Sequence, residues 1–195
     1  MTYYPAFLNL EDRKVLLFGG GTVALRKARS LVKTGACIAA ISKKFSDPFL
    51  KFARKQKIKL TRSSAFPKVL HNVVLVVAAT SDPRFNQKVY ERCNRENIFV
   101  NVVDDPKHST FIVPSLLQRG PLQIAVSTGG KSPFLAKLIR KKLKRQFSGE
   151  YRHIVEWLGK EREKVKRMIK EQKARQRYLQ KLVEKKLSMF EHTKK

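Results

Sequence analysis

The strongest constraint on this chain is a short apolar run that ends in a cluster of glycines. Lys14–Phe18 is followed at once by residues 19–24 (GGGTVA), which have the pattern G-x-G-x-x-A, and then by a segment with helical apolar spacing. A buried strand, a tight turn and a helix in this order are the context in which such a pattern indicates dinucleotide binding. Gly19 would permit the tight turn, Gly21 the approach of a pyrophosphate, and Ala24 close packing of helix on strand. A strand–helix turn without any ligand is the alternative interpretation.

The first hundred residues alternate between strand and helix patterns. Further strands are expected at residues 37–41, 58–62, 73–79 and 98–103, and helices at residues 47–55, begun by Asp47 as N-cap, and 81–96. The run 73–79 (VVLVVAA) is continuous and β-branched, as a central parallel strand should be. The alternation predicts an α/β fold with a doubly wound, Rossmann-like parallel sheet.

The pattern changes after residue 106. Two strands are expected at 110–113 and 122–127, separated by a short helical stretch, and Ser132-Pro133 begins an amphipathic helix that runs to about 147. From residue 148 the chain reads as helical, with a break in the polar stretch 170–177. We therefore divide the chain into a nucleotide-binding domain (1–106), a small α+β region (107–147) and a basic helical domain (148–195).

The composition limits the partners of the chain. The net charge is +28, and half of it lies in residues 137–195. Such a positive field attracts nucleic acid, anionic membranes, or small polycarboxylate or phosphate substrates. The base composition of the genome could also produce this charge without any such ligand. No apolar run approaches the roughly 20 residues that cross a bilayer, and Met1–Pro5 lacks a signal-peptide pattern. Only Cys37 and Cys93 are present; both are expected to be buried spectators in a cytoplasmic protein.

Ligands of open α/β sheets bind beyond the carboxyl ends of the strands. The second strand is followed by Ser42, Lys43 and Lys44, at the place where an NAD-binding protein usually has an acid for the ribose hydroxyls. Two ammonium groups could accept a 2′-phosphate, so both NAD and NADP stay open. Backbone contacts to the ribose, with solvated lysines, are the alternative.

Two further segments could carry chemistry. Asp104 ends the strand at 98–103, where a base beside a hydride donor would be useful; it could equally cap a turn. Residues 127–133 (STGGKSP) form a glycine loop that leads into a helix N-terminus, an arrangement that binds anions or simply caps a helix. His108 could face the cleft or lie in a solvated loop. The four histidines have no metal-ligand spacing, so no metal site is expected.

Together these segments resemble the precorrin-2 dehydrogenase family, the sirohydrochlorin-forming module of siroheme synthases. The resemblance covers residues 5 to about 145, and its two most specific motifs lie at 111–115 and 125–133. The matching segments are 5–10 (PAFLNL), 15–24 (VLLFGGGTVA) with Arg26-Lys27, 78–80 (AAT), 101–104 (NVVD), 111–115 (FIVPS) and 125–133 (AVSTGGKSP).

The resemblance implies NAD-dependent oxidation of precorrin-2 to sirohydrochlorin, with Asp104 as the catalytic acid/base. It also implies a homodimer formed through region 107–147, a helical tail that closes over the substrate, and, in some members, insertion of ferrous iron or cobalt. Uroporphyrinogen methylation is expected to belong to another protein. A non-catalytic domain whose basic tail binds nucleic acid is the alternative from another functional class. The expected cofactor contacts are Gly19, Gly21, Thr22, Val23, Lys43, Lys44 and Thr80, and the expected substrate contacts are Ser127, Thr128, Gly129, Gly130, Lys131 and Ser132.

Overall fold

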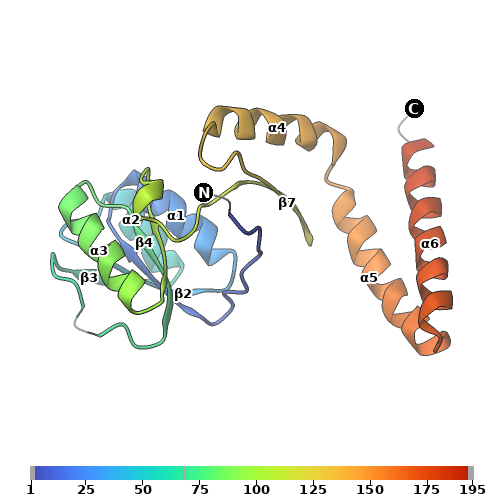
Figure 1. The fold of residues 1–195 in the computed structure, drawn as a ribbon, viewed down its shortest axis with the longest axis horizontal. Helices are drawn as coiled ribbons and strands as arrows, with labels where there is room; N and C mark the ends of the chain where they lie inside the picture. Colours follow the sequence, from blue (N-terminus) through green and yellow to red (C-terminus); the bar gives the residue numbers. More distant parts are fainter. Residues whose placement is uncertain (1–2, 68, 193–195) are drawn as a thin grey trace. The chain divides into compact units, whose positions relative to one another are not determined.

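The chain divides into two compact units, Met1–Val113 and Pro114–Lys195, in a computed structural model that describes residues 3–67 and 69–192 (Figure 1). The first unit contains a parallel sheet with helices, and the second contains a hairpin and three helices.

The first unit is built on five parallel strands in the order β3-β2-β1-β4-β5. The chain runs from the central β1 outward to β2 and β3, returns to the other side of β1 as β4, and continues to β5. This reversal makes a topological switch point between β1 and β4, and the prediction of a doubly wound sheet is confirmed. The strands are β1 (Lys14–Phe18), β2 (Cys37–Ser42), β3 (Lys59–Arg62), β4 (Val73–Ala78) and β5 (Phe99–Val102).

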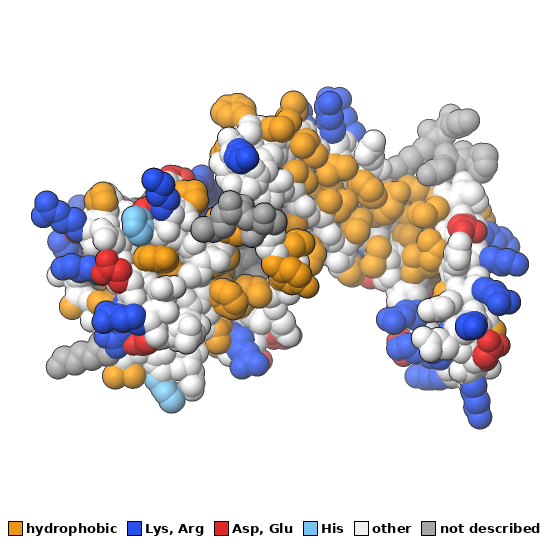
Figure 2. Space-filling model, viewed as in Figure 1, with side chains coloured by type: hydrophobic (Ala, Val, Ile, Leu, Met, Phe, Trp, Pro, Cys, Tyr) orange, Lys and Arg blue, Asp and Glu red, His pale blue; other side chains and the backbone are white. Residues whose placement is uncertain are grey.

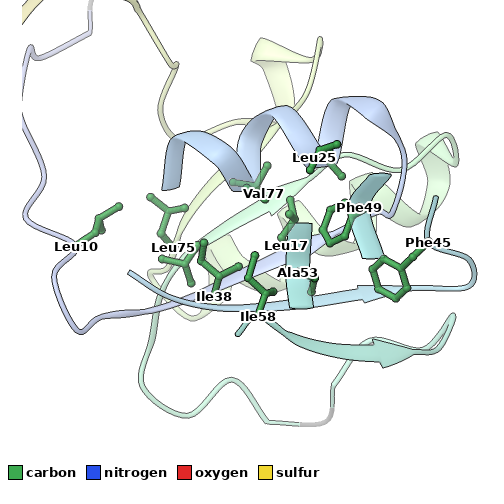
Figure 3. Packing of buried hydrophobic residues seen from close by; sticks show 14 residues of the cluster. Leu10, Leu17, Leu25, Ile38, Phe45, Phe49, Ala53, Ile58, Leu75 and Val77 are labelled. Atoms are coloured by element: carbon green, nitrogen blue, oxygen red, sulfur yellow. The ribbon is translucent and has the colours of Figure 1, made fainter. Parts of the chain in front are cut away.

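Helices cover both faces of this sheet. On one face α1 (Thr22–Val32) and α2 (Asp47–Lys55) bury Leu25 and Phe49 against the strands, as Figure 3 shows. On the other face α3 (Pro83–Arg95) buries Val89 and Cys93. Burial of each large apolar side chain favours folding by roughly 1.5–3 kcal/mol, and the two cores hold the strand ends that carry the site.

Two local predictions for this unit need correction. The N-cap of α2 is Ser46, and Asp47 is the first helical residue. The negative charge of Asp47 interacts favourably there with the positive end of the helix dipole. Cys37 is exposed because it begins β2 at the rim of the sheet, whereas Cys93 is buried as expected.

The strand expected at 110–113 is also wrong. This segment follows a short 3₁₀ turn, η1 (Pro106–His108), and lies beside β5 without joining the sheet. The Thr110 N–H donates to the Val100 carbonyl at 2.8 Å, but the Phe111 carbonyl accepts from the side chain of Asn101 at 3.2 Å. Side-chain bonds therefore replace the strand ladder, and the segment belongs to the first unit.

The second unit begins with an antiparallel hairpin of β6 (Ser115–Arg119) and β7 (Leu122–Val126). The short helix expected before residue 119 is wrong, because Leu117 is buried and pairs with Ile124 across the hairpin. Three helices follow: α4 (Pro133–Gln146), α5 (Tyr151–Met168) and α6 (Gln172–His192). The helix break falls at residues 169–171, at the start of the polar stretch. Among the described residues, no helix is long and apolar enough to span a membrane.

Candidate functional site

A pocket of about 700 Å³ opens in the first unit at the carboxyl ends of the parallel strands. This is the edge at which open α/β sheets bind their ligands. Every residue expected to contact the cofactor lines it, together with Asp104. The lining comprises Phe18, residues 19–23, Ile41, Ser42, Lys43, Lys44, Ser63, Ser64, residues 79–82, Phe85, Val103 and Asp104.

The glycine turn forms the floor of this pocket. Gly19 has φ +116°, and a Cβ there would overlap with the carbonyl group of Ala79. By contrast, a Cβ on Gly21 would meet no protein atom within 4 Å. Gly21 is also the N-cap of α1, and no side chain caps that helix, so its first N–H groups remain available to an anion. Open space before an uncapped helix N-terminus fits the pyrophosphate of a dinucleotide.

The loop after β2 is bound directly to this turn. The Ser46 N–H donates to the Gly20 carbonyl at 2.9 Å, and the Ser42 hydroxyl donates to the Lys44 carbonyl at 2.8 Å. Lys43 and Lys44 are exposed where they line the pocket. The loop backbone is therefore fixed, while both ammonium groups stay in contact with water.

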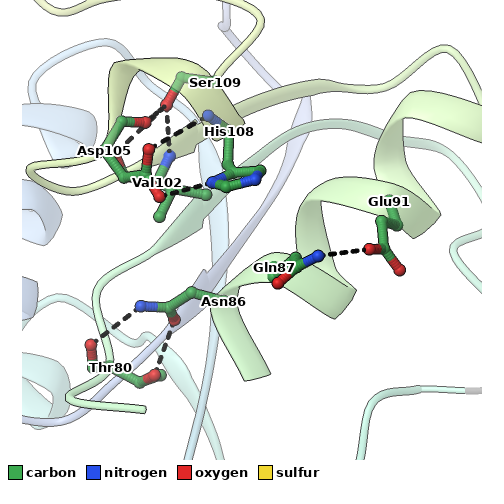
Figure 4. A network of polar contacts seen from close by, with 8 residues as sticks. All are labelled: Thr80, Asn86, Gln87, Glu91, Val102, Asp105, His108 and Ser109. Carbon is green, nitrogen blue, oxygen red and sulfur yellow. Dashed lines mark hydrogen bonds and ion pairs between the residues drawn. The ribbon is translucent and has the colours of Figure 1, made fainter. Parts of the chain in front are cut away.

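The loop after β4 is held by an amide–hydroxyl pair that Figure 4 shows. The Thr80 hydroxyl donates to Asn86 Oδ1 at 2.7 Å, and Asn86 Nδ2 donates to the Thr80 carbonyl at 3.0 Å. Asn86 is buried on α3, and Asp82 caps the same helix by accepting from the Phe85 N–H at 3.0 Å. These bonds fix Thr80 at the pocket wall.

Asp104 stands at the tip of a tight turn after β5. Its φ is +61°, a left-handed conformation that Asp tolerates better than most residues. The turn is closed by the Asp105 N–H, which donates to the Val102 carbonyl at 3.2 Å, and by the Ser109 hydroxyl, which donates to the Asp105 carbonyl at 2.8 Å. Within residues 3–67 and 69–192, no hydrogen bond or ion pair engages the Asp104 carboxylate. The carboxylate is therefore free to accept a proton in the pocket.

A lysine on α1 lies behind this turn. Lys27 donates through Nζ to Asn101 Oδ1 at 3.1 Å, and Asn101 is only 7% exposed. Burial lowers the pKa of Lys27 below its usual value, the neighbouring Arg26 lowers it further, and the Asp104 carboxylate opposes both. Lys27 thus places a cation near the carboxylate, a role that the sequence analysis did not assign.

His108 does not line the pocket. Its Nδ1 lies 2.6 Å from a carboxylate oxygen of Asp105 (Figure 4). This hydrogen bond lowers the pKa of Asp105. The ring of His108 also packs edge-on against that of Tyr90. The pair of Asp105 and His108 stabilises the turn next to Asp104. Of these three residues, only Asp104 lines the pocket.

The glycine loop expected to bind substrate lies in the second unit. Thr128 Oγ1 accepts from the Ser132 N–H at 2.9 Å, and Ser132 in turn caps α4 by accepting from the Leu135 N–H at 3.3 Å. Gly129 and Gly130 have φ values of +63° and +82°. The loop is a preformed turn, and the pocket is built from the first unit alone.

Sequence reasoning missed two kinds of pocket residue. Ser63 and Ser64 line the wall and follow the short strand β3, so their place at a strand end was the available signal. Phe85 lies in the first turn of α3, and only the packed structure reveals that it reaches the pocket. Among the described residues, no three His, Cys, Asp or Glu side chains gather in a way that could hold a metal ion.

Two family profiles match the chain. Residues 6–115 match the family described as "Putative NAD(P)-binding", and residues 119–146 match the family described as "Sirohaem biosynthesis protein central". The first match covers the strand–helix unit and its pocket. The second covers the hairpin turn, the glycine loop and α4.

Known proteins resemble the chain over most of its length. Siroheme synthase 2 of Yersinia enterocolitica is 38% identical over 183 residues, which cover 94% of this chain and 39% of that protein. Siroheme synthase 2 of Aeromonas salmonicida is 42% identical over 178 residues, which cover 91% and 37%. The chain thus spans about two fifths of the length of these relatives. Among solved structures, SirC, precorrin-2 dehydrogenase, superposes with a TM-score of 0.78 at 27% identity and covers 92% of this chain and 89% of SirC.

Proposed function

This chain belongs to the NAD(P)-binding family that its residues 6–115 match, and we propose that it oxidises precorrin-2 to sirohydrochlorin. One observation carries the proposal: the Asp104 carboxylate and the glycine turn line the same pocket. The structural likeness to a precorrin-2 dehydrogenase and the sequence likeness to siroheme synthases support the choice of substrate. The relatives are biosynthetic enzymes, and we propose the cytoplasm as the place of the reaction.

The oxidation removes two hydrogens from the tetrapyrrole, one as a hydride and one as a proton. NAD(P)⁺, when bound, supplies the hydride acceptor. The proton passes to the Asp104 carboxylate, which then releases it to water through the open pocket. The fixed turn between Val102 and Asp105 holds that carboxylate in position, and a positioned base contributes typically 10²–10⁴-fold to rate.

The glycine loop of the second unit is proposed to bind the carboxylates of the substrate. The Gly129 N–H donates to the Ser127 hydroxyl at 3.0 Å, and the Lys131 N–H donates to the Thr128 carbonyl at 3.1 Å. The attraction for anions therefore comes from the Lys131 side chain and the positive end of α4. Thr128 and Ser132 already bond within the turn, so they act by holding its shape. Together with Ser127, these residues are proposed to form an anion-binding loop of the second unit.

A dimer formed through the second unit is also proposed. Figure 2 shows hydrophobic side chains gathered on one face of the second unit. In the hairpin and α4 of this unit, Leu116, Phe134, Leu135 and Leu138 are 42–86% exposed. Contiguous exposed apolar surface of this kind marks an interaction site. Light scattering of the chain should give twice the chain mass, and Leu135→Glu/Leu138→Glu should give the mass of one chain. A single-chain mass for the unaltered protein overturns the dimer.

Incubating the chain with enzymatically made precorrin-2 and either NAD⁺ or NADP⁺, and following sirohydrochlorin absorbance, tests the main proposal. Asp104→Ala should lower the rate by about 10²–10⁴-fold and leave nucleotide affinity within about twofold. Asp47→Asn, an exposed acid outside the pocket, is the control and should keep the full rate. No turnover with either nucleotide refutes the proposed function. An unchanged rate in Asp104→Ala refutes only the role of that residue.

Metal insertion is a second candidate, since both curated relatives are named siroheme synthases. Ferrous iron or cobalt would then be a substrate delivered to sirohydrochlorin after oxidation. Adding either ion once oxidation is complete, with and without the chain, tests this directly. Equal rates of metal uptake with and without the chain would exclude it.

A further inference from the structure

Half of the net charge of +28 lies in residues 137–195, and the proposed dehydrogenase gives it no role. In the second unit, α5 and α6 lie side by side and antiparallel (Figure 1), and a hollow of about 200 Å³ opens between them beside the turn that joins them. The residues that line this hollow are Arg162 and Lys166 of α5 and Gln172, Arg175, Gln176 and Leu179 of α6. We propose that the hollow binds a phosphate group, free or as a monoester. The proposal goes beyond the dehydrogenase and does not depend on it.

The spacing of the lining residues shows that each helix turns one face toward the hollow. On α5 the two lining residues are four positions apart, and on α6 the lining positions follow the spacing i, i+3, i+4, i+7. Such positions share one side of a helix, and between packed helices they are usually apolar. Here five of the six lining side chains are cations or amides. The surface that α5 and α6 share is therefore cationic at this end.

Contacts elsewhere hold the two helices together. Tyr151 of α5 packs edge-on against Phe190 of α6 with ring centroids 5.5 Å apart, and the Lys186 ammonium lies over the Trp157 ring at 5.0 Å. Val165, between the two cations of α5 in sequence, is buried. The packing of this helix pair thus has apolar and aromatic contacts of its own, and it does not require the cations of the hollow.

The charge of these cations is largely uncompensated within the protein. Among residues 3–67 and 69–192, no carboxylate lines the hollow, and neither the Arg162 nor the Arg175 guanidinium forms an ion pair or hydrogen bond. Lys166 donates to Glu163 Oε1 at 2.6 Å, but an ammonium has three N–H groups, so donors remain for a ligand. Three like charges around one hollow repel one another, and a bound anion of two charges would relieve that repulsion.

A phosphate group matches these donors better than a carboxylate does. A phosphate monoester carries about −1.5 to −2 charges near neutral pH and has three strong acceptor oxygens, whereas a carboxylate has one charge and two oxygens. Guanidinium groups donate in pairs to phosphate, the ammonium adds a point charge, and the Gln172 and Gln176 amides offer neutral donors. Pockets for larger molecules measure about 300–1,000 Å³. The hollow therefore suits one phosphate group rather than a whole nucleotide.

Calorimetric titration of the whole chain with inorganic phosphate, glycerol 3-phosphate and acetate tests the site. Sodium chloride at about 0.1 M in every titration screens the general field of the chain. We expect at least one of the two phosphates to bind with a Kd below about 1 mM, and acetate to bind at least about tenfold more weakly. Tighter binding of the ester would identify an esterified ligand, and tighter binding of phosphate would identify the free ion. Weaker binding of both, or equally tight binding of acetate, overturns the proposal.

A matched pair of double variants separates the hollow from other places that could take up phosphate, such as the glycine turn of the first unit. Arg162→Gln/Arg175→Gln should weaken phosphate binding at least about tenfold. The control Lys160→Gln/Lys181→Gln removes the same charge from exposed positions of α5 and α6 outside the hollow, and its affinity should stay within about twofold. Full binding by the first variant, or an equal loss in both, refutes the hollow as the site.

A third variant tests the repulsion between the cations without removing any of them. Gln176→Glu places a carboxylate in the hollow, where it takes over the part of the bound anion. Without phosphate this variant should unfold at a higher temperature than the unaltered chain. Phosphate should raise the Tm of the unaltered chain by binding to its folded state, and should raise that of the variant much less. An equal rise in both chains contradicts the proposal.

Discussion

Gly20 and Gly21 are neighbours in one turn, yet alanine at the two positions should have opposite effects. A Cβ on Gly20 would overlap with the Lys44 carbonyl oxygen and lie 2.8 Å from Cδ1 of Phe45. Phe45 is only 5% exposed, so neither group can move aside freely. At Gly21 the added methyl meets no protein atom, and the backbone (φ −90°, ψ −168°) is open to any residue. Only a bound nucleotide would clash with the added methyl group.

The sizes of the two effects follow from these contacts. Overpacking at Gly20 costs about 1–3 kcal/mol, and displacement of the loop also weakens the bond from the Ser46 N–H to the Gly20 carbonyl, worth about 1 kcal/mol. A total of about 3 kcal/mol lowers Tm by roughly 6–12 °C in a chain of this size. Alanine at position 21 is a poorer N-cap than glycine, but it also lowers the conformational entropy of the unfolded chain. The two effects offset each other, so the stability of Gly21→Ala should stay within about 1 kcal/mol of that of the unaltered chain.

Thermal unfolding by circular dichroism and nucleotide binding by calorimetry, each on both variants, check this reasoning. Gly20→Ala should unfold at lower temperature, while Gly21→Ala should unfold like the unaltered chain and bind nucleotide at least about tenfold more weakly. Full nucleotide affinity in Gly21→Ala would refute the assignment of the pyrophosphate to this turn. A loss of stability in Gly21→Ala equal to that of Gly20→Ala would refute the distinction between the two glycines.

Three further predictions concern groups around the site. Lys27→Met deprives Asn101 of a hydrogen-bond donor and should lower the free energy of unfolding by about 1–2 kcal/mol near pH 7. Because the fold lowers the pKa of Lys27 below 10.5, the difference in stability between the unaltered chain and the variant should grow as pH rises toward that value. Thermal unfolding of both chains across this pH range measures that difference. Asp105→Asn should destabilise the chain above the ordinary carboxyl pKa, and the difference in Tm should vanish as pH falls through the lowered pKa of Asp105. Burial raises the pKa of Cys93 to about 12, so mass spectrometry after thiol labelling should find Cys37 modified in the native chain and both cysteines only after unfolding; native labelling of both would contradict this burial.

The sequence predicted the first unit well because its central strands, β1 and β4, are buried on both faces. Continuous apolar runs such as Val73–Ala78 have no polar alternation that could suggest another assignment. Turn-forming residues, such as Asn72 before β4 and Gly19 after β1, mark their ends. The same strand ends carry Lys43, Thr80 and Asp104, so the sequence alone predicts that these residues line the pocket. Their positions followed from one rule about parallel sheets rather than from any contact.

The second unit was harder to predict because its first strand depends on its partner. Ser115–Arg119 (SLLQR) has no strong strand propensity, and it becomes a strand through cross-hairpin pairs such as Leu117 with Ile124. The more β-branched segment at 110–113 is instead bound by the Asn101 side chain. Local propensity was outweighed in both places by a contact that the sequence does not reveal.

Strand order also decides what the charged residues of the pocket can do together. Lys44 and Asp104 both follow parallel strands, so the sequence could place both at the ligand edge but not on opposite sides of the glycine turn. Had β4 joined the sheet beside β3, the lysines and the carboxylate would stand on the same side, and a phosphate bound by the lysines would repel the proton acceptor. The order β3-β2-β1-β4-β5 separates them across β1. In the proposed dehydrogenase, this separation would let the cationic end hold an anionic nucleotide while the carboxylate at the other end accepts the proton.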